Sequence, residues 1–215
     1  MQSDHELPVQ TNFETAAALA RERLAGLDFD ARCRAAGIEP TVGSALLPFI
    51  DRRFMISRRG LILSPADSGP PPEKWEEIIA LHYLARATGA AAADELITYR
   101  QVPDGAAYWE PFNRRTAGIL LGAFAGRLRA LGPAAAALGG REVSGHGDFA
   151  FAVRALPRVE YLFVCWEGDE EFPPEVRVLF DRSILDYLPA EDITVLCQMV
   201  CLKLARAATV AKVRA

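Results

Sequence analysis

The chain has 215 residues, of which 51% are hydrophobic and 24% are charged, and its formal net charge is −4. This composition can fill a core of native size, so it excludes wholesale disorder. The weak negative charge excludes long-range attraction to nucleic acid or to an anionic membrane.

The first part of the chain predicts an arm, two helices and a group of short strands. Residues 1–10 are polar and predict a flexible arm. Thr11 and Glu14 have the spacing of a capping box, so we predict that a helix begins there. A second short helix is predicted at about 28–36. Residues 44–63 hold short apolar runs broken by charge and glycine, which are typical of strands in a meander.

The middle of the chain predicts mostly helix. Residues 65–72 are rich in proline, glycine and serine and predict a loop. A strong helix is predicted from Pro72 and Glu73 to about Thr88, with acidic residues in its first turn. A strand follows over 96–102, and further helix is predicted over 106–125 and in the alanine-rich run to Leu138.

The last third predicts strands followed by a helix. Apolar residues alternate with other residues over 149–153 and 176–180, as in half-buried strands, and the run 161–166 is almost continuously apolar. Pro189 opens a final helix that extends to about Ala207.

These elements predict an α+β fold. We expect a single domain over 11–215, with a mainly antiparallel sheet formed by 44–63 and 148–181 and with helices packed on one face. The free-thiol pattern of the four cysteines, the absence of a stretch of ~20 apolar residues and the polar start predict a cytoplasmic protein without a signal peptide.

Cys197 and Cys201 are the first candidate metal ligands, because they lie four residues apart on one helix face. The same face carries Ile193, Leu196 and Leu204, so the pattern is that of an apolar stripe. Buried free cysteine behaves as a small hydrophobic residue. We therefore predict that both cysteines pack in the core, and we predict no metal site.

An acidic turn, defined as residues 166–172, is the most distinctive candidate site. It follows an apolar strand and precedes two prolines, and we expect Trp166 and Phe172 to anchor it. Its carboxylates could hold a hard cation or contact a partner, or they could form a solvated turn. The candidate binding residues here are Trp166, Glu167, Asp169, Glu170, Glu171 and Asp181.

Aromatic, basic and histidine side chains form further candidate sites. Tyr99, Arg100 and Tyr108 frame a turn, and the pair Arg114-Arg115 lies one or two helical turns after Tyr108, where it could meet an anionic ligand or face solvent. His82 shares a helix face with apolar residues, and His146 lies in a glycine-rich loop. Each histidine could be a ligand or general base, or a structural imidazole.

The segment from Trp166 to Pro173, together with Leu179-Phe180-Asp181 and Glu191-Asp192, resembles an uncharacterised family of anaerobic bacteria and archaea with a domain of unknown function. The similarity covers most of residues 12–206. Some members of that family carry an N-terminal iron–sulfur cluster domain, which this sequence does not match. The resemblance implies a setting in one-carbon, corrinoid or other metal-cofactor metabolism. It supplies no catalytic residue and no cofactor.

Three functions follow from these features. The first is a binding or accessory protein that holds a small ligand or a protein partner with the acidic turn and the Tyr99–Tyr108 segment. The second is a cation-dependent enzyme that uses the carboxylates of the same turn. The third is a tetrapyrrole or corrinoid carrier that uses His82 or His146. Because the final helix is apolar on two faces, it is either central to the core or a homodimer contact.

Overall fold

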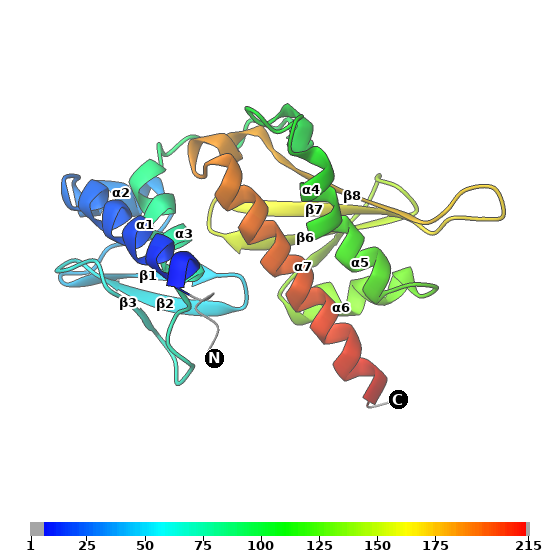
Figure 1. Cartoon of the computed structure of the whole chain (residues 1–215), viewed down its shortest axis with the longest axis horizontal. Helices are drawn as coiled ribbons and strands as arrows, with labels where there is room; N and C mark the ends of the chain where they lie inside the picture. The colour runs from blue at the N-terminus through cyan, green and yellow to red at the C-terminus, as the bar shows by residue number, and fades with distance from the viewer. Residues whose placement is uncertain (1–6, 214–215) are drawn as a thin grey trace. The chain divides into compact units, whose positions relative to one another are not determined.

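A computed structural model describes the backbone of residues 7–213 and the side chains of residues 14–207 (Figure 1). The chain divides into two compact units. The first unit contains the described residues up to Ala90 together with Asp186–Leu188, and the second contains Ala91–Leu185 and the chain from Pro189 onward. Helices combine with antiparallel sheets, which confirms the predicted α+β class.

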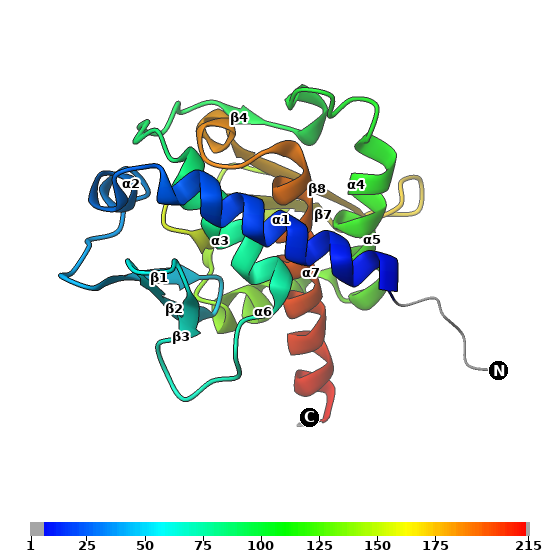
Figure 2. The same cartoon turned by 60° about the vertical axis from the view of Figure 1, so that its left-hand side comes forward.

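The first unit contains a small sheet and helices. Its sheet has the order β1-β2-β3, and both pairings are antiparallel. The elements in chain order are α1 (Leu7–Ala25), α2 (Phe29–Ala35), β1 (Ser44–Phe49), β2 (Arg52–Ser57), β3 (Leu63–Pro65) and α3 (Lys74–Arg86). Figure 2 shows α1 running across α3 in this unit.

Helix α1 begins at Leu7, before the predicted start at Thr11, so the backbone of residues 7–10 is helical rather than part of an arm. Proline is tolerated in a first helical turn, which makes Pro8 compatible with this earlier start. The expected cap at Thr11 therefore lies within the helix. Residues 1–6 of the predicted arm lie outside the described residues.

Local sequence explains how the first unit is held. Alternate residues of β1 are buried, as expected for a strand with one face toward a core. A capping box formed by Glu73 and Glu76 starts α3. The Glu76 carboxylate also forms an ion pair with the Arg52 guanidinium, with a nitrogen–oxygen distance of 2.7 Å. The hydroxyl of Tyr83 donates to the carbonyl of Ala36 at 2.6 Å. These contacts tie α3 to β2 and to the end of α2.

The second unit is built on a larger sheet with the order β4-β8-β7-β6-β5, in which every pairing is antiparallel. Helix α7 crosses in front of β6 and β7, and α5 lies beside it (Figure 1). The strands are β4 (Leu96–Ile97), β5 (Arg141–Val143), β6 (Phe149–Leu156), β7 (Val159–Trp166) and β8 (Glu175–Asp181). The helical elements are η1 (Tyr99–Gln101), α4 (Trp109–Arg115), α5 (Ala117–Ala123), η2 (Leu128–Ala130), α6 (Leu131–Ala137), η3 (Arg182–Asp186) and α7 (Ala190–Val213).

The expectation that residues 44–63 and 148–181 share one sheet is wrong, because they form separate sheets. In both places each strand pairs with the next one along the chain: β1 with β2 and β2 with β3, and likewise β6 with β7 and β7 with β8. Such local antiparallel pairing provides backbone hydrogen-bond partners along both edges of the central strands without a long crossover connection.

Two other predicted elements differ from the structure. The predicted strand over 96–102 ends at Ile97, because Thr98 and Gln101 form a capping box that turns the chain into η1. The predicted helix over 106–125 is divided into α4 and α5 at Thr116, whose backbone is not helical (φ −125, ψ −90). Both differences depend on local hydrogen bonding that periodicity does not report.

The core of the second unit lies between its sheet and α7. The fully buried hydroxyl of Tyr161 donates to the carbonyl of Ile193 at 2.9 Å, and the rings of Phe151 and Phe163 stack at 5.1 Å. Cys197 and Cys201 are both fully buried in α7, in agreement with the predicted packing role. Within the described residues, no helix combines the length and apolarity needed to cross a membrane.

Candidate ligand-binding site

A pocket of about 490 Å³ lies in the second unit, next to the first turns of α7. Its wall comes from η1, the turn that follows η1, α4 and α7. Aromatic and aliphatic side chains form much of the surface, and three of the described lining residues are charged. The lining residues are Tyr99, Asp104, Ala107, Tyr108, Arg115, Ala190, Glu191, Thr194 and Val195.

The turn after η1 holds the first part of this wall. Gly105 is required there, because a Cβ atom at this position would lie 1.9 Å from the carbonyl oxygen of Tyr99. Its amide donates to the carbonyl of Val102 at 2.8 Å. Asp104 adopts a left-handed backbone (φ 62), a conformation that aspartate tolerates better than most residues. The tight turn places Asp104 and Tyr99 on the same pocket.

Tyr99 forms an ordered wall. Its ring stacks on Phe112 with centroids 4.2 Å apart and an interplanar angle of 7°. Its hydroxyl donates to the carbonyl of Ala190 at 3.2 Å, at the start of α7. Tyr161 anchors the next part of the same helix through Ile193. Two tyrosine hydroxyls therefore fix the first turn of α7, which carries the opposite wall of the pocket.

Among the described residues that line the pocket, Arg115 is the one cation, and it is half-buried at the end of α4. Its Nε donates to the Gln198 side-chain oxygen at 2.9 Å and its Nη1 donates to the Tyr108 hydroxyl at 3.1 Å. Both acceptors are neutral. A guanidinium has five N–H donors, so these two bonds leave three donors without a partner among the described side chains.

The carboxylates of Asp104 and Glu191 line the same pocket and are exposed. Neither forms an ion pair or a hydrogen bond with any residue whose side chain the structure describes. Glu191 lies in the first turn of α7, where a negative charge is favourable to the helix. The pocket therefore holds one positive and two negative groups that do not neutralise one another.

The acidic turn lies elsewhere in the second unit, in the loop that connects β7 with β8. Glu167 forms a 2.7 Å ion pair with Arg129, and the Arg177 guanidinium lies 5.0 Å from the Trp166 ring. Phe172 is 67% exposed, so the expectation that it anchors the turn is wrong. Glu170 and Glu171 are exposed as well.

The Asp169 side chain orders this turn in place of Phe172. Its carboxylate accepts hydrogen bonds from the backbone amides of Glu171 and Phe172, each at 2.8 Å. These bonds, that of Phe172 first, lower the pKa of Asp169 below its ordinary value. The chain reverses at Gly168, where an added Cβ would lie 2.5 Å from the nitrogen of Pro174. Asp169 therefore has a structural role within the loop.

Asp181 also binds backbone. It accepts from the amides of Ala93 and Ser183 at 2.9 Å and from that of Glu95 at 3.3 Å. Desolvation opposes ionisation, but the hydrogen bonds from Ser183, Ala93 and Glu95 together hold the pKa of Asp181 below its ordinary value. Arg182 pairs with the side chain of Glu95 at the same place. Asp181 therefore fastens the segment before β4 to the end of β8.

The other predicted site residues are dispersed. Arg100 is exposed, with its guanidinium 4.8 Å from the Trp109 ring. His146 is half-buried in the loop between β5 and β6, and His82 is half-buried on α3 in the first unit, where it has an interaction partner. Among the described residues there is no group of three or more histidine, cysteine, aspartate or glutamate side chains that could hold a metal ion.

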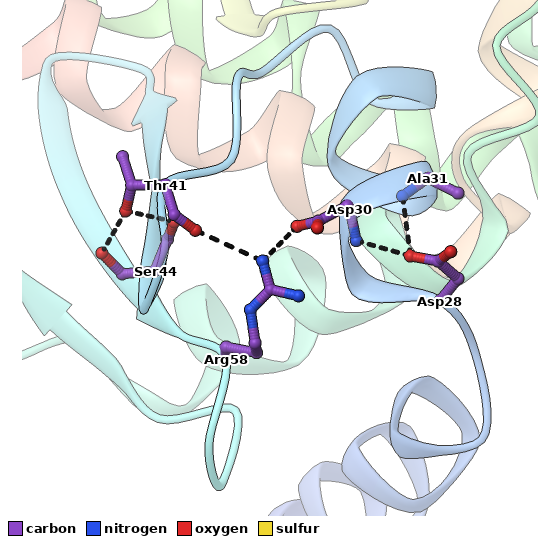
Figure 3. A network of polar contacts seen from close by, with 6 residues as sticks. All are labelled: Asp28, Asp30, Ala31, Thr41, Ser44 and Arg58. Carbon is purple, nitrogen blue, oxygen red and sulfur yellow. Dashed lines mark hydrogen bonds and ion pairs between the residues drawn. The ribbon is translucent and has the colours of Figure 1, made fainter.

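A second pocket, of about 520 Å³, lies in the first unit beside the start of α2. Figure 3 shows the polar network at its edge, in which the Arg58 guanidinium reaches Asp30 and the carbonyl of Thr41. The lining cations are compensated, because Arg58 pairs with Asp30 and Arg21 pairs with Glu77. This pocket therefore offers a ligand less unsatisfied charge than the pocket beside α7.

Sequence reasoning identified part of the pocket beside α7. Tyr99 and Tyr108 were candidates, and both line it. The sequence predicts that Arg115 either meets an anionic ligand or faces solvent, and the structure has it on the pocket wall. Asp104 is not predicted as a site residue, and Glu191 is predicted only together with the carboxylates of the acidic turn or as a favourable charge at a helix start. Tyr108 and Arg115 are seven residues apart, which is two helical turns, and this spacing is the sequence feature that predicts them on the same helix face.

Comparison with protein families shows that residues 28–203 match the family described as Domain of unknown function (DUF3786), and the chain belongs to this family. The uncharacterised family predicted from the sequence is thereby confirmed at this level. Neither a curated protein nor a solved structure matches the chain.

Proposed function

We propose that this protein binds a small organic molecule in the pocket beside α7. The observation that carries the proposal is the half-buried Arg115 guanidinium on the pocket wall, with neutral hydrogen-bond partners and three remaining N–H donors. A partly desolvated guanidinium gains most from an anionic oxygen that accepts two of its N–H groups at once.

The shape of the pocket supports the same function. A volume of about 490 Å³ falls within the range of roughly 300–1,000 Å³ that is common for small-molecule sites. Tyr108 offers aromatic surface, the buried Tyr99 forms part of the wall, and Ala107 and Val195 supply aliphatic walls. Because Tyr99 is stacked on Phe112 and bonded to α7, this surface is ordered before a ligand arrives, which lowers the entropic cost of binding.

The acidic turn has a separate place in this proposal, as a contact for a basic protein partner. Its support is the 67% exposed Phe172 ring on a turn that Asp169 keeps ordered, next to the exposed Glu170 and Glu171. An exposed aromatic ring with flanking charge is the kind of feature that anchors protein interfaces.

The cellular setting is also proposed. The resemblance to a family of anaerobic bacteria and archaea supports a cytoplasmic binding or accessory protein in metal-cofactor or one-carbon metabolism. Val195, Met199 and Leu202 are the predicted second apolar face of α7; Val195 lines the pocket, and the half-buried Met199 and Leu202 would suit a homodimer contact. Neither proposal depends on the charge pattern of the pocket.

Equilibrium dialysis tests the binding function. Wild-type protein, Arg115→Gln and Arg114→Gln are dialysed against a low-molecular-weight cell extract, and retained compounds are identified by mass spectrometry. Arg114 is exposed on the same helix and does not line the pocket, so its variant removes the same charge nearby. We expect wild type and Arg114→Gln to retain a compound that Arg115→Gln loses. If no retained compound depends on Arg115, the proposal is wrong.

A further inference from the structure

The charges of the pocket beside α7 form a pattern that a singly charged ligand cannot satisfy. Arg115 contributes one positive charge, and Asp104 and Glu191 contribute two negative charges. The described side chains provide none of the three with a partner of opposite charge. Charges that line one pocket influence one another more strongly when a ligand displaces the water between them. The pocket is therefore complementary to a ligand that carries both a positive and a negative charge.

We infer that the pocket binds a small zwitterion, whose anionic oxygen group contacts Arg115 and whose ammonium group contacts Glu191 or Asp104. This inference rests on the proposed binding function and specifies its ligand class. A carboxylate or phosphate can accept two of the remaining Arg115 N–H groups in parallel. An ammonium has three donors, which the exposed carboxylates can accept.

Ligands of other charge types are disfavoured by the same residues. A simple anion on Arg115 would face repulsion from the two carboxylates of the pocket. A singly charged cation that extends from Glu191 to Arg115 would remove the water of Arg115 without supplying an acceptor, and leaving a charge desolvated and unpaired is costly. A neutral ligand would incur that cost at both ends. A zwitterion satisfies both signs.

The face of α7 gives the spacing of the two contacts. Glu191, Thr194, Val195 and Gln198 recur at intervals of three and four residues, so they share one helix face. Gln198 holds Arg115 through its side-chain oxygen. Seven residues of helix rise by about 10 Å, and side chains from both ends shorten this gap. The two charged groups of the ligand are therefore separated by several bonds, with the half-buried Val195 facing its middle.

A matched panel of probes tests the inference by titration calorimetry. The amino carboxylates are glycine, 4-aminobutyrate, 6-aminohexanoate and phenylalanine, and O-phosphoethanolamine represents an amino phosphate. Each carboxylate is compared with its N-acetyl derivative and its amide. We expect at least one zwitterion to bind wild type at least tenfold more tightly than either of its capped forms, and we expect the spaced compounds to bind more tightly than glycine.

Variants assign each end of the probe. Arg115→Gln should remove the preference for the free acid over the amide, and the double change Asp104→Asn with Glu191→Gln should remove the preference for the free amine. Arg114→Gln and Glu110→Gln alter exposed charges on α4 outside the pocket and should bind like wild type.

Failure of the inference differs from failure of the binding function. If capped or singly charged forms bind as tightly as the zwitterions, or if no zwitterion of the panel binds at millimolar concentration, the inferred ligand class is wrong. The binding function itself still stands in that case if dialysis yields a compound that requires Arg115. The binding function is wrong as well if dialysis yields no compound whose retention requires Arg115.

Discussion

The Tyr161 hydroxyl offers a sharp test of how the pocket wall is held. It is fully buried and donates to the carbonyl of Ile193 at 2.9 Å, in the first turns of α7. In Tyr161→Phe the ring remains, including its edge-to-face contact with Phe180 at 6.0 Å. The change removes one neutral hydrogen bond. The Ile193 carbonyl keeps its place in the helix hydrogen-bond pattern, so no buried group is left without a partner.

The expected cost follows from this geometry. One neutral hydrogen bond contributes about 1 kcal/mol to the free energy of unfolding, and a larger penalty requires an orphaned polar group. Urea unfolding should therefore show a loss of about 1 kcal/mol for Tyr161→Phe with an unchanged m-value. Tyr108→Phe is the control, because that side chain is 42% exposed and its loss should cost under about 0.5 kcal/mol. Equal effects of the two changes would refute the anchoring role.

A second hydroxyl on the same helix turn extends this test. Tyr99 donates to Ala190, three residues before Ile193. Because Tyr99 and Tyr161 hold one short segment, their changes to phenylalanine should be non-additive in a double-mutant cycle. Additive losses would show that the two hydroxyls act on independent parts of α7.

Three further predictions concern residues that sequence reasoning singled out. Changing Cys197 and Cys201 to alanine should lower the free energy of unfolding by about 1–3 kcal/mol through lost burial, with unchanged metal content by elemental analysis; loss of bound iron or zinc would contradict packing. Asp181→Asn should make the free energy of unfolding less dependent on pH in the acid range. The pKa of Asp181 is lowered in the folded state, so the wild-type carboxylate stabilises the fold above its unfolded pKa of about 3.9. This stabilisation is lost as the pH falls through the folded pKa. Asp169→Asn should speed hydrogen exchange at the two amides that it binds, whereas Glu170→Gln should not; equal exchange in both variants would contradict the ordering role of Asp169.

Sequence periodicity predicts much of the fold: α3 lies within its predicted segment, and β6, β7, β8 and α7 each overlap a predicted segment and extend beyond it. These elements have their apolar side chains at regular intervals on buried faces, which is what periodicity measures. The partition into two sheets was not predictable in the same way. It depends on which strands pair, and that is decided by turns and by contacts distant in sequence.

The site was harder to predict than the fold for a related reason. Arg115 becomes a pocket residue through Gln198, which is 83 residues away in the sequence. Asp104 and Glu191 join it only after η1 and α7 are brought together. The acidic turn was conspicuous because its charges are consecutive, yet the Asp169 carboxylate is occupied by its own backbone. The sequence shows where charged residues are concentrated, but it does not show which of them lack a hydrogen-bond or ion-pair partner in the fold.

The central claim is that a small molecule binds beside α7, and the tyrosines report its location. Tyr99 and Tyr108 line the pocket, whereas Tyr83 and Tyr187 belong to the first unit. Protein labelled with ¹³C only in its tyrosine rings can be titrated by NMR with the unlabelled low-molecular-weight cell extract. The account predicts shifts for the Tyr99 and Tyr108 rings that are absent in Arg115→Gln, with Tyr83 and Tyr187 unchanged. Shifts confined to Tyr83 and Tyr187, or no shifts at all, would contradict it.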